Sequence, residues 1–122
     1  MDKATEERPW GSFTVLYDGE DCKVKTLVIK PGQEISYQFH YKRQEEWTVI
    51  SGTGTLTLDD EKIKVQPGDH ITILPLQKHT IKSDENTSLK IIEVQTGTYF
   101  GEDDIVRITD RYDRFDRDWE KS

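Results

Sequence analysis

Three side chains that commonly bind divalent metal ions, those of Gln38, His40 and Glu45, occur close together in the sequence. In an extended segment Gln38 and His40 lie two residues apart and project from the same face of the strand. Glu45 follows a short polar turn and can return to that face from the neighbouring strand. The spacing therefore predicts that an amide, an imidazole and a carboxylate converge on one metal ion.

The positions of these residues within Gly32–Gly52 resemble the first motif of the cupin family. That motif runs glycine, five residues, His-x-His, three or four residues, glutamate, six residues and glycine. Counted from the first glycine, Gln38 takes the first histidine position, His40 the second, and Glu45 the glutamate position. The resemblance implies that all three are ligands.

A second register of the same motif fits poorly. It would make His40 the first ligand, Lys42 the second and Glu46 the acid. The first gap would grow to seven residues, the last would shrink to five, and a cation would have to bind a metal. We therefore reject this register.

A fourth ligand is implied by the segment Gly68–His79, which reads GDHITILPLQKH. It resembles the second cupin motif, which normally reads glycine, five residues, Pro-x-Gly-x-x-His. The second glycine is absent, and the interval from Pro75 to His79 is one residue short. By this resemblance His79 is the fourth ligand, whereas His70 fits no ligand position.

Two imidazoles, one carboxylate and one amide carbonyl suit a borderline divalent ion, Zn²⁺ first, with Mn²⁺, Co²⁺, Ni²⁺ or Fe²⁺ as alternatives. Because Gln38 replaces a histidine with a neutral oxygen donor, the site is better suited to polarising oxygen atoms than to redox chemistry. This argues against an iron-dependent oxygenase.

The elements that must position these ligands read as short strands. Runs rich in β-branched and aromatic residues alternate with turn residues, and helix signals are weak. Such a series favours an all-β closed barrel or double-sheet jelly roll, which with the motifs above implies the cupin double-stranded β-helix. The expected strands are Lys23–Ile29, Ile35–His40, Glu45–Ile50, Gly54–Leu58, Lys62–Val65, His70–Leu74, Thr80–Ser83 and Leu89–Gln95.

The length of 122 residues predicts a single domain over residues 1–122. We expect a core over about residues 8–108, a polar arm at residues 1–7, and a charged, aromatic tail at residues 109–122. In that tail Tyr112, Phe115 and Trp119 have helical spacing. A short amphipathic helix and a solvated tail both remain open there.

The formal net charge of -7 argues against nucleic acid and anionic membranes as partners. Cys22 is the only cysteine, so an intrachain disulfide is excluded. Because the first residues lack the apolar core of a signal peptide, we expect a cytoplasmic protein.

Longer segments resemble the C-terminal domain of type II mannose-6-phosphate isomerase, which occurs in bifunctional proteins that also carry mannose-1-phosphate guanylyltransferase activity. The resemblance implies a metal-dependent sugar-phosphate isomerase that interconverts mannose 6-phosphate and fructose 6-phosphate at Gln38, His40, Glu45 and His79. The segments that carry it are Arg8–Leu16, Val24–Trp47, Ile50–Leu58 and Ile91–Arg114.

The same resemblance implies roles for residues around the metal. A cation must meet the substrate phosphate, and Arg43 is the first choice for this or for transition-state stabilisation, because guanidinium offers a planar fork to oxygen atoms. Arg107 is the second choice and Lys42 the third. Glu93, an acid in an apolar strand, is the candidate base, because burial can raise its pKa.

One stretch departs from the family, whose HHHRAEHW-like segment becomes HYKRQEEW here. These changes remove no metal ligand, but they could remove a histidine that orients the sugar or transfers a proton. They therefore concern the choice of substrate and the reaction rate more than metal binding. The family residues His40, Arg43, Glu45 and Trp47 are kept, whereas Tyr41, Lys42, Gln44 and Glu46 differ.

A second function remains open. No Gly-rich phosphate loop precedes the cupin segment in this sequence, so we expect no guanylyl transfer. The alternative to an isomerase is then a non-catalytic cupin that binds a sugar or nucleotide sugar as the partner of a separate guanylyltransferase. Because cupins commonly pair, we also expect a homodimer that uses the RPWG segment and the aromatic tail.

Overall fold

The computed structural model describes residues 4–109. Within them the chain forms strands and one short 3-10 helix, and no helix there is long or apolar enough to span a membrane. The elements are β1 (Ala4–Arg8), β2 (Gly11–Asp18), β3 (Cys22–Ile29), β4 (Tyr37–His40), β5 (Arg43–Ser51), β6 (Gly54–Leu58), β7 (Glu61–Val65), β8 (His70–Ile73), β9 (His79–Ser83), β10 (Leu89–Gly97), η1 (Glu102–Asp104) and β11 (Ile105–Thr109).

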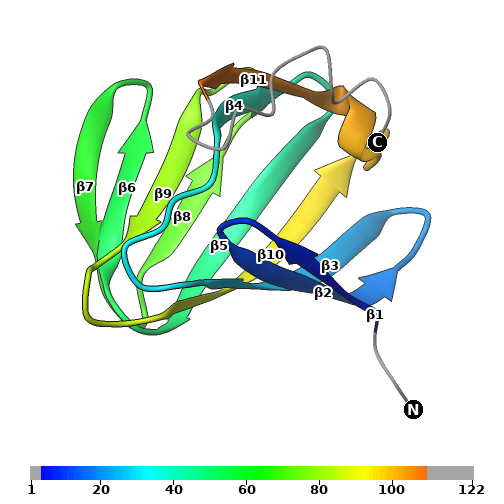
Figure 1. The fold of residues 1–122 in the computed structure, drawn as a ribbon. Helices are drawn as coiled ribbons and strands as arrows, with labels where there is room; N and C mark the ends of the chain where they lie inside the picture. Colours follow the sequence, from blue (N-terminus) through cyan, green and yellow to red (C-terminus); the bar gives the residue numbers. More distant parts are fainter. Residues whose placement is uncertain (1–3, 110–122) are drawn as a thin grey trace.

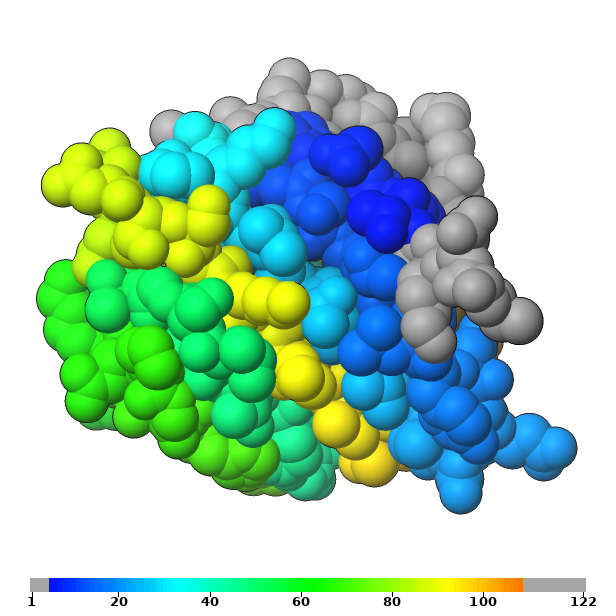
Figure 2. Space-filling view, turned by 90° about the horizontal axis from the view of Figure 1, so that it is seen from below, coloured from blue at the N-terminus to red at the C-terminus, as the bar shows by residue number. Residues whose placement is uncertain are grey.

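The strands form two antiparallel sheets that face each other (Figure 1). One has the order β1-β2-β3-β10-β5-β8 and the other the order β11-β4-β9-β6-β7. In the view from below, β10 runs as a yellow band between the bluer β3 and the greener β5, as expected for a strand in the middle of its sheet (Figure 2). The expected all-β, jelly-roll type of fold is confirmed.

The interior has an apolar part and a polar part, because each central strand changes character along its inward face. On β10, buried Leu89 and Ile91 are followed on the same face by buried Glu93. The antiparallel register places Glu93 between Lys25 of β3 and Trp47 of β5. The apolar part includes Leu27, Ile29, Val49, Leu56, Ile81, Leu89 and Ile91. The charged residues of several strands thus gather in one region of the barrel.

Both glycines of the first motif have backbone angles that favour glycine. Gly32 has a φ of 74° and Gly52 a φ of 84°, in the left-handed region. A Cβ atom on Gly52 would lie 2.0 Å from the carbonyl oxygen of Ser88. The motif glycines therefore make the tight connections on either side of the ligand-bearing strands.

The N-terminal arm was expected to lie outside the core fold, and this is corrected for Ala4–Glu7. These residues belong to β1, which pairs with β2 from Ala4 opposite Val15 to Arg8 opposite Gly11. An edge strand with exposed side chains needs no apolar alternation, so the segment gave no strand signal. β2 and β11 were also absent from the expected runs. β11 ends at Thr109. The tail aromatics Tyr112, Phe115 and Trp119, for which a helix and a solvated tail were both open, lie outside the described residues.

The close approach at Gly52 generates a stability prediction. Gly68 has a similar φ of 95°, but a Cβ atom there would meet nothing within 4 Å. Gly68→Ala should therefore lose only roughly 1–2 kcal/mol of unfolding free energy, from the left-handed backbone. Gly52→Ala adds a clash with backbone and should lose more than about 3 kcal/mol. Urea unfolding of the two variants measures both values, and equal losses would contradict the packing described at Gly52.

Candidate metal centre

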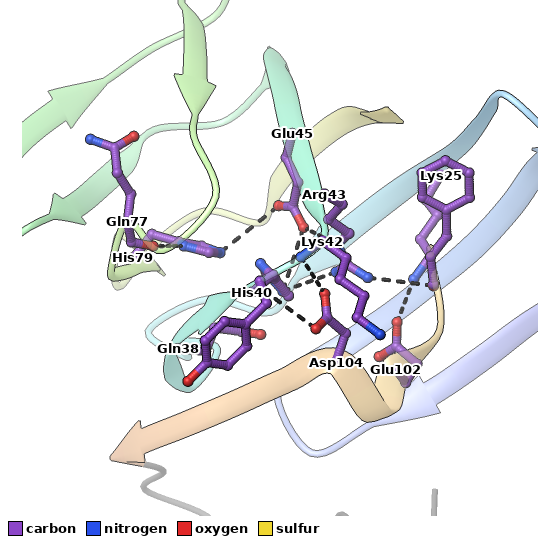
Figure 3. Close-up of polar contacts among 12 residues, drawn as sticks. Lys25, Gln38, His40, Lys42, Arg43, Glu45, Gln77, His79, Glu102 and Asp104 are labelled. Atoms are coloured by element: carbon purple, nitrogen blue, oxygen red, sulfur yellow. Dashed lines mark hydrogen bonds and ion pairs between the residues drawn. The ribbon is translucent and has the colours of Figure 1, made fainter. Parts of the chain in front are cut away.

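Three potential metal ligands converge inside the barrel from different strands. His40 ends β4, Glu45 lies on β5, and His79 begins β9 (Figure 3). Their ligand atoms all lie within 4.8 Å of one another. Gln38 lines the same pocket and is paired with His79 across β4 and β9. The structure thus brings all four predicted ligands to one pocket.

The carboxylate of Glu45 lies between the two imidazoles. Its Oε2 is 3.6 Å from Nε2 of His40, and its Oε1 is 3.9 Å from Nε2 of His79. The side chains of His40, Glu45 and His79 are only 3%, 1% and 1% exposed. Trp47 donates from Nε1 to Oε1 of Glu45 at 2.9 Å, which fixes the carboxylate.

Both histidines are held in the neutral form that binds metals. Burial lowers the pKa of His40 to about 3 and also lowers the pKa of His79. Nδ1 of His79 is 2.9 Å from the carbonyl oxygen of Gln77, so the proton is assigned to Nδ1. The lone pair of His79 Nε2 then faces Glu45, as in histidines that bind a metal through Nε2.

Arg43 keeps Glu45 ionised. Burial alone would raise the pKa of Glu45, but positive charge beside it, from His40 once that imidazole is protonated at low pH and from Arg43 at every pH, holds it well below its usual range. Arg43 donates from Nε to Oε2 of Glu45 at 2.8 Å, and its Nη2 lies 3.0 Å from Nε2 of His40. A metal bound through that nitrogen would compete with Arg43 for the same lone pair.

Glu93 is a second buried acid in the pocket, with the opposite charge state. Burial and the negative charge of Glu45 raise the pKa of Glu93 well above its usual value. Glu93 therefore keeps its proton beside the ionised Glu45. One ionised and one protonated carboxyl group therefore lie side by side.

The donor set fits a divalent metal ion. Two neutral imidazoles and one carboxylate are already gathered, and the amide of Gln38 donates from Nε2 to the carbonyl oxygen of Ser36 at 3.3 Å. That bond leaves the amide oxygen of Gln38 as the atom able to serve as a ligand. Nitrogen and oxygen donors in this ratio suit a borderline ion.

The other predicted site residues divide into two groups. Arg43, Glu93 and Arg107 line the pocket, and Arg107 is paired with Gln38 across β11 and β4. Lys42 does not line it: its side chain is exposed, and its Nζ lies 5.3 Å from the ring centre of Tyr99. The structure therefore separates Lys42 from the other three.

The departures from the family lie away from the pocket. Tyr41 and Lys42 are exposed in the turn between β4 and β5. Gln44 and Glu46 occupy the opposite face of β5 from Glu45, and Glu46 contacts His70 there. None of the four differing residues lines the pocket, whereas the retained family residues His40, Arg43, Glu45 and Trp47 all do.

Several residues of the site were not predicted from the sequence. Lys25 and Glu102 form an ion pair at 3.0 Å beside Arg43, and Arg8 also lines the pocket. Asp104 accepts hydrogen bonds from the backbone N–H groups of Tyr41 and Lys42, and so holds the turn between His40 and Arg43. Only Lys25 offered a signal, as a lysine on the inward face of an apolar strand.

The sequence is similar to those of several known proteins. Residues 2–110 match the family described as mannose-6-phosphate isomerase C-terminal. The chain is 38% identical over 112 residues to mannose-1-phosphate guanylyltransferase RfbM of Salmonella typhimurium, covering 92% of this chain and 23% of that protein. It is 42% identical over 108 residues to the xanthan biosynthesis protein XanB of Xanthomonas campestris, covering 88% and 23%. The chain thus spans about a quarter of the length of these relatives.

Solved structures confirm the cupin double-stranded β-helix. Pac13 of Streptomyces, described as a nucleoside dehydratase, has a TM-score of 0.73 at 18% identity, over 88% of this chain and 86% of that one. The capsular polysaccharide assembling protein CapF of Staphylococcus aureus has a TM-score of 0.73 at 22% identity, over 86% and 32%. A Klebsiella pneumoniae protein with a double-stranded β-helix domain has a TM-score of 0.67 at 26% identity, over 72% and 77%.

The buried neutral histidines predict a pH dependence of stability. In the unfolded chain His40 and His79 have the ordinary pKa of 6.5 and become protonated below that pH. In the folded chain they stay neutral, so stability falls as the pH falls. With a folded-state pKa of about 3, His40 should cost about 2 kcal/mol at pH 5 relative to pH 7 or above, and His79 should act in the same sense. The raised pKa of Glu93 acts in the opposite sense, so the readout is the difference between variant and wild type.

Urea unfolding between pH 7 and pH 5 checks this expectation. His40→Gln and His79→Gln should each lose less stability over this range than wild type does. The comparison variant, His70→Gln, removes an exposed histidine on the outer face and shows what the loss of a histidine that is not buried does to the slope. Identical slopes in all four proteins would show that neither buried histidine is held neutral.

Proposed function

The chain belongs to the mannose-6-phosphate isomerase C-terminal family, and from that premise we propose that it is a metal-dependent isomerase of mannose 6-phosphate and fructose 6-phosphate. The observation that carries the proposal is the convergence of His40, Glu45 and His79 within one pocket. The chain spans only about a quarter of the length of its relatives, so the proposal is limited to the activity of the matching domain.

The proposed ligands are Gln38, His40, Glu45 and His79. Zn²⁺ agrees best with this set, and Mn²⁺, Co²⁺, Ni²⁺ and Fe²⁺ are the alternatives. When bound, such an ion supplies Lewis acidity, which polarises hydroxyl and carbonyl oxygens of an open-chain sugar. The residues around the ligands must then orient the sugar and move its proton.

Glu93 is the proposed proton-transfer group. Aldose–ketose isomerisation moves a proton between neighbouring carbons, so it needs a group that can exchange a proton near neutral pH. Burial and the charge of Glu45 keep a proton on the carboxyl group of Glu93, and it lines the same pocket as the ligands. A carboxyl group of this kind can donate its proton to an oxygen and then accept one from carbon.

Arg43 is proposed to position the ligands and to stabilise negative charge that develops beside them. Its Nε and Nη2 contact Glu45 and His40, and its Nη1 lies 3.4 Å from the carbonyl oxygen of Phe100. These contacts tie the guanidinium to the metal site. Arg107, on the facing sheet, is the second cation proposed to contact the substrate, and Lys42 is too far outside the pocket to do so.

The ligand assignment predicts metal stoichiometry. Wild-type protein should bind one Zn²⁺ per chain in equilibrium dialysis with metal analysis. His79→Ala and Gln38→Ala should each weaken Zn²⁺ binding by at least about 10-fold. Removing a residue that only hydrogen-bonds to a ligand already costs about that much, so the loss of a ligand should cost no less. His70→Ala is the matched control and should bind like wild type. Unchanged binding by His79→Ala would remove His79 from the ligand set.

The reaction is tested by a coupled assay with metal-loaded protein and mannose 6-phosphate. Glu93→Gln should lower kcat by about 10²–10⁴-fold, the usual contribution of a proton-transfer group. Glu46→Gln makes the same change on the outer face of β5 and should leave kcat unchanged. Absence of turnover by wild type with mannose, glucose or related sugar phosphates, beside a working positive control, would reject the isomerase.

Stabilisation by such a sugar or a nucleotide sugar without any turnover would instead favour the alternative, a binding partner of a separate guanylyltransferase. A homodimer is also proposed, although Trp10 of the RPWG segment is buried in the core and does not offer an exposed contact. A monomeric mass in solution would reject the dimer.

A further inference from the structure

A sugar phosphate needs a cationic subsite in the pocket besides the metal. Four cationic side chains line the pocket among the described residues, namely Arg8, Lys25, Arg43 and Arg107. They face the two carboxylates of Glu45 and Glu102 and the protonated carboxyl group of Glu93. The charges of the lining therefore favour an anionic ligand, and a metal ion would add to that preference.

Arg43 is poorly placed to take the phosphate. Its nitrogens are engaged with Glu45, His40 and Phe100, and its side chain is 4% exposed. Binding a phosphate would break an ion pair that holds a proposed metal ligand.

Two other cations lie close to the same aromatic ring, one on each side of it in the strand register. The guanidinium carbon of Arg8 lies 4.8 Å from the ring centre of Phe13, and Nζ of Lys25 lies 4.3 Å from it. The register explains this: on β2, Phe13 faces Glu6 of β1 and Leu27 of β3, so Arg8 and Lys25 are its diagonal neighbours. All three side chains line the pocket that contains the metal ligands.

The hydrogen bonding of Lys25 points to a ligand. Its ammonium group has three N–H donors and its side chain is 4% exposed, yet within residues 4–109 it makes one hydrogen bond, to Oε2 of Glu102 at 3.0 Å. The ring of Phe13 attracts the charge but accepts no ordinary hydrogen bond. A buried ammonium group with unused donors favours an anion that can accept them.

Arg8 can exchange its partners at little cost. Its side chain is 29% exposed, and it donates to Oε1 of Glu6, which is 52% exposed, and to the carbonyl oxygen of Glu7. Exposed ion pairs of this type contribute little to stability. A phosphate could therefore take the place of the Glu6 carboxylate and accept two parallel hydrogen bonds from the guanidinium group.

We propose that Arg8 and Lys25, gathered on the ring of Phe13, form the subsite that binds the phosphate group of the substrate. This rests on the proposed function only in the choice of a phosphorylated sugar; the subsite itself takes a phosphate monoester. Lys25 supplies a buried ammonium group with N–H donors available for an anion, and Arg8 supplies a guanidinium group near the solvent. In Figure 3, Lys25 and Glu102 lie on the side of Arg43 opposite to His79, so a sugar bound at the metal would extend toward them.

The test is titration calorimetry of the full chain with mannose 6-phosphate, and with inorganic phosphate as a competitor. Arg8→Gln should raise the Kd for mannose 6-phosphate by about 10- to 100-fold, as expected for the loss of charge-assisted hydrogen bonds. Because Lys25→Met alone would strand Glu102, Lys25→Met is combined with Glu102→Gln, and this double variant should show a similar loss. Circular dichroism checks that both variants are folded.

Two controls separate the subsite from general charge effects. Lys42→Met removes a cation outside the pocket and should bind like wild type. Glu102→Gln alone keeps Lys25 and removes its competitor, so it should bind as tightly as wild type or more tightly. Wild-type Kd values in both Arg8→Gln and the double variant would overturn the subsite, as would failure of wild type to bind either phosphate compound.

These outcomes are distinct from those of the isomerase test. Binding that depends on Arg8 and Lys25 without turnover would keep the subsite and reject the isomerase. Turnover with an unchanged KM in both variants would keep the isomerase and reject the subsite.

Discussion

The site depends on one costly feature, an ionised carboxylate buried in the interior of the barrel. Glu45 is 1% exposed, and a buried charge without compensation would be strongly unfavourable. Arg43 and Trp47 donate to its two oxygens, and the imidazoles of His40 and His79 lie beside it. Because its charge needs these neighbours, they also leave the group in the ionised form that a metal ligand requires.

The barrel accommodates this charge by separating its interior into two parts. Central strands carry aliphatic residues along one part of their inward faces and ionisable residues along the other, so the register of β3, β10 and β5 alone gathers Lys25, Glu93 and Glu45. Burial and the ionised Glu45 together raise the pKa of the neighbouring Glu93, which leaves a protonated acid next to an ionised one. The two proposed roles, Glu45 as a metal ligand and Glu93 as a proton-transfer group, thus have one electrostatic origin.

The convergence of Gln38, His40 and Glu45 on one pocket could be predicted from the sequence because local rules determine it. Alternation along a strand puts Gln38 and His40 on one face, and a short turn returns Glu45 to it. The ion pair between Lys25 and Glu102 could not be predicted, because its members are 77 residues apart and meet only through the fold. β1 was missed for the opposite reason: an edge strand needs pairing but no buried face, so its polar sequence carries no alternation.

The most direct test of the metal centre is anomalous diffraction from a crystal of the protein loaded with Zn²⁺. The account predicts one anomalous peak at about 2.0–2.2 Å from Nε2 of His40, an oxygen of Glu45 and Nε2 of His79. It also predicts that the peak lies next to the amide oxygen of Gln38 and that Nη2 of Arg43 has left Nε2 of His40. A peak bound elsewhere, or full loading with Arg43 still in contact with His40 Nε2, would contradict it.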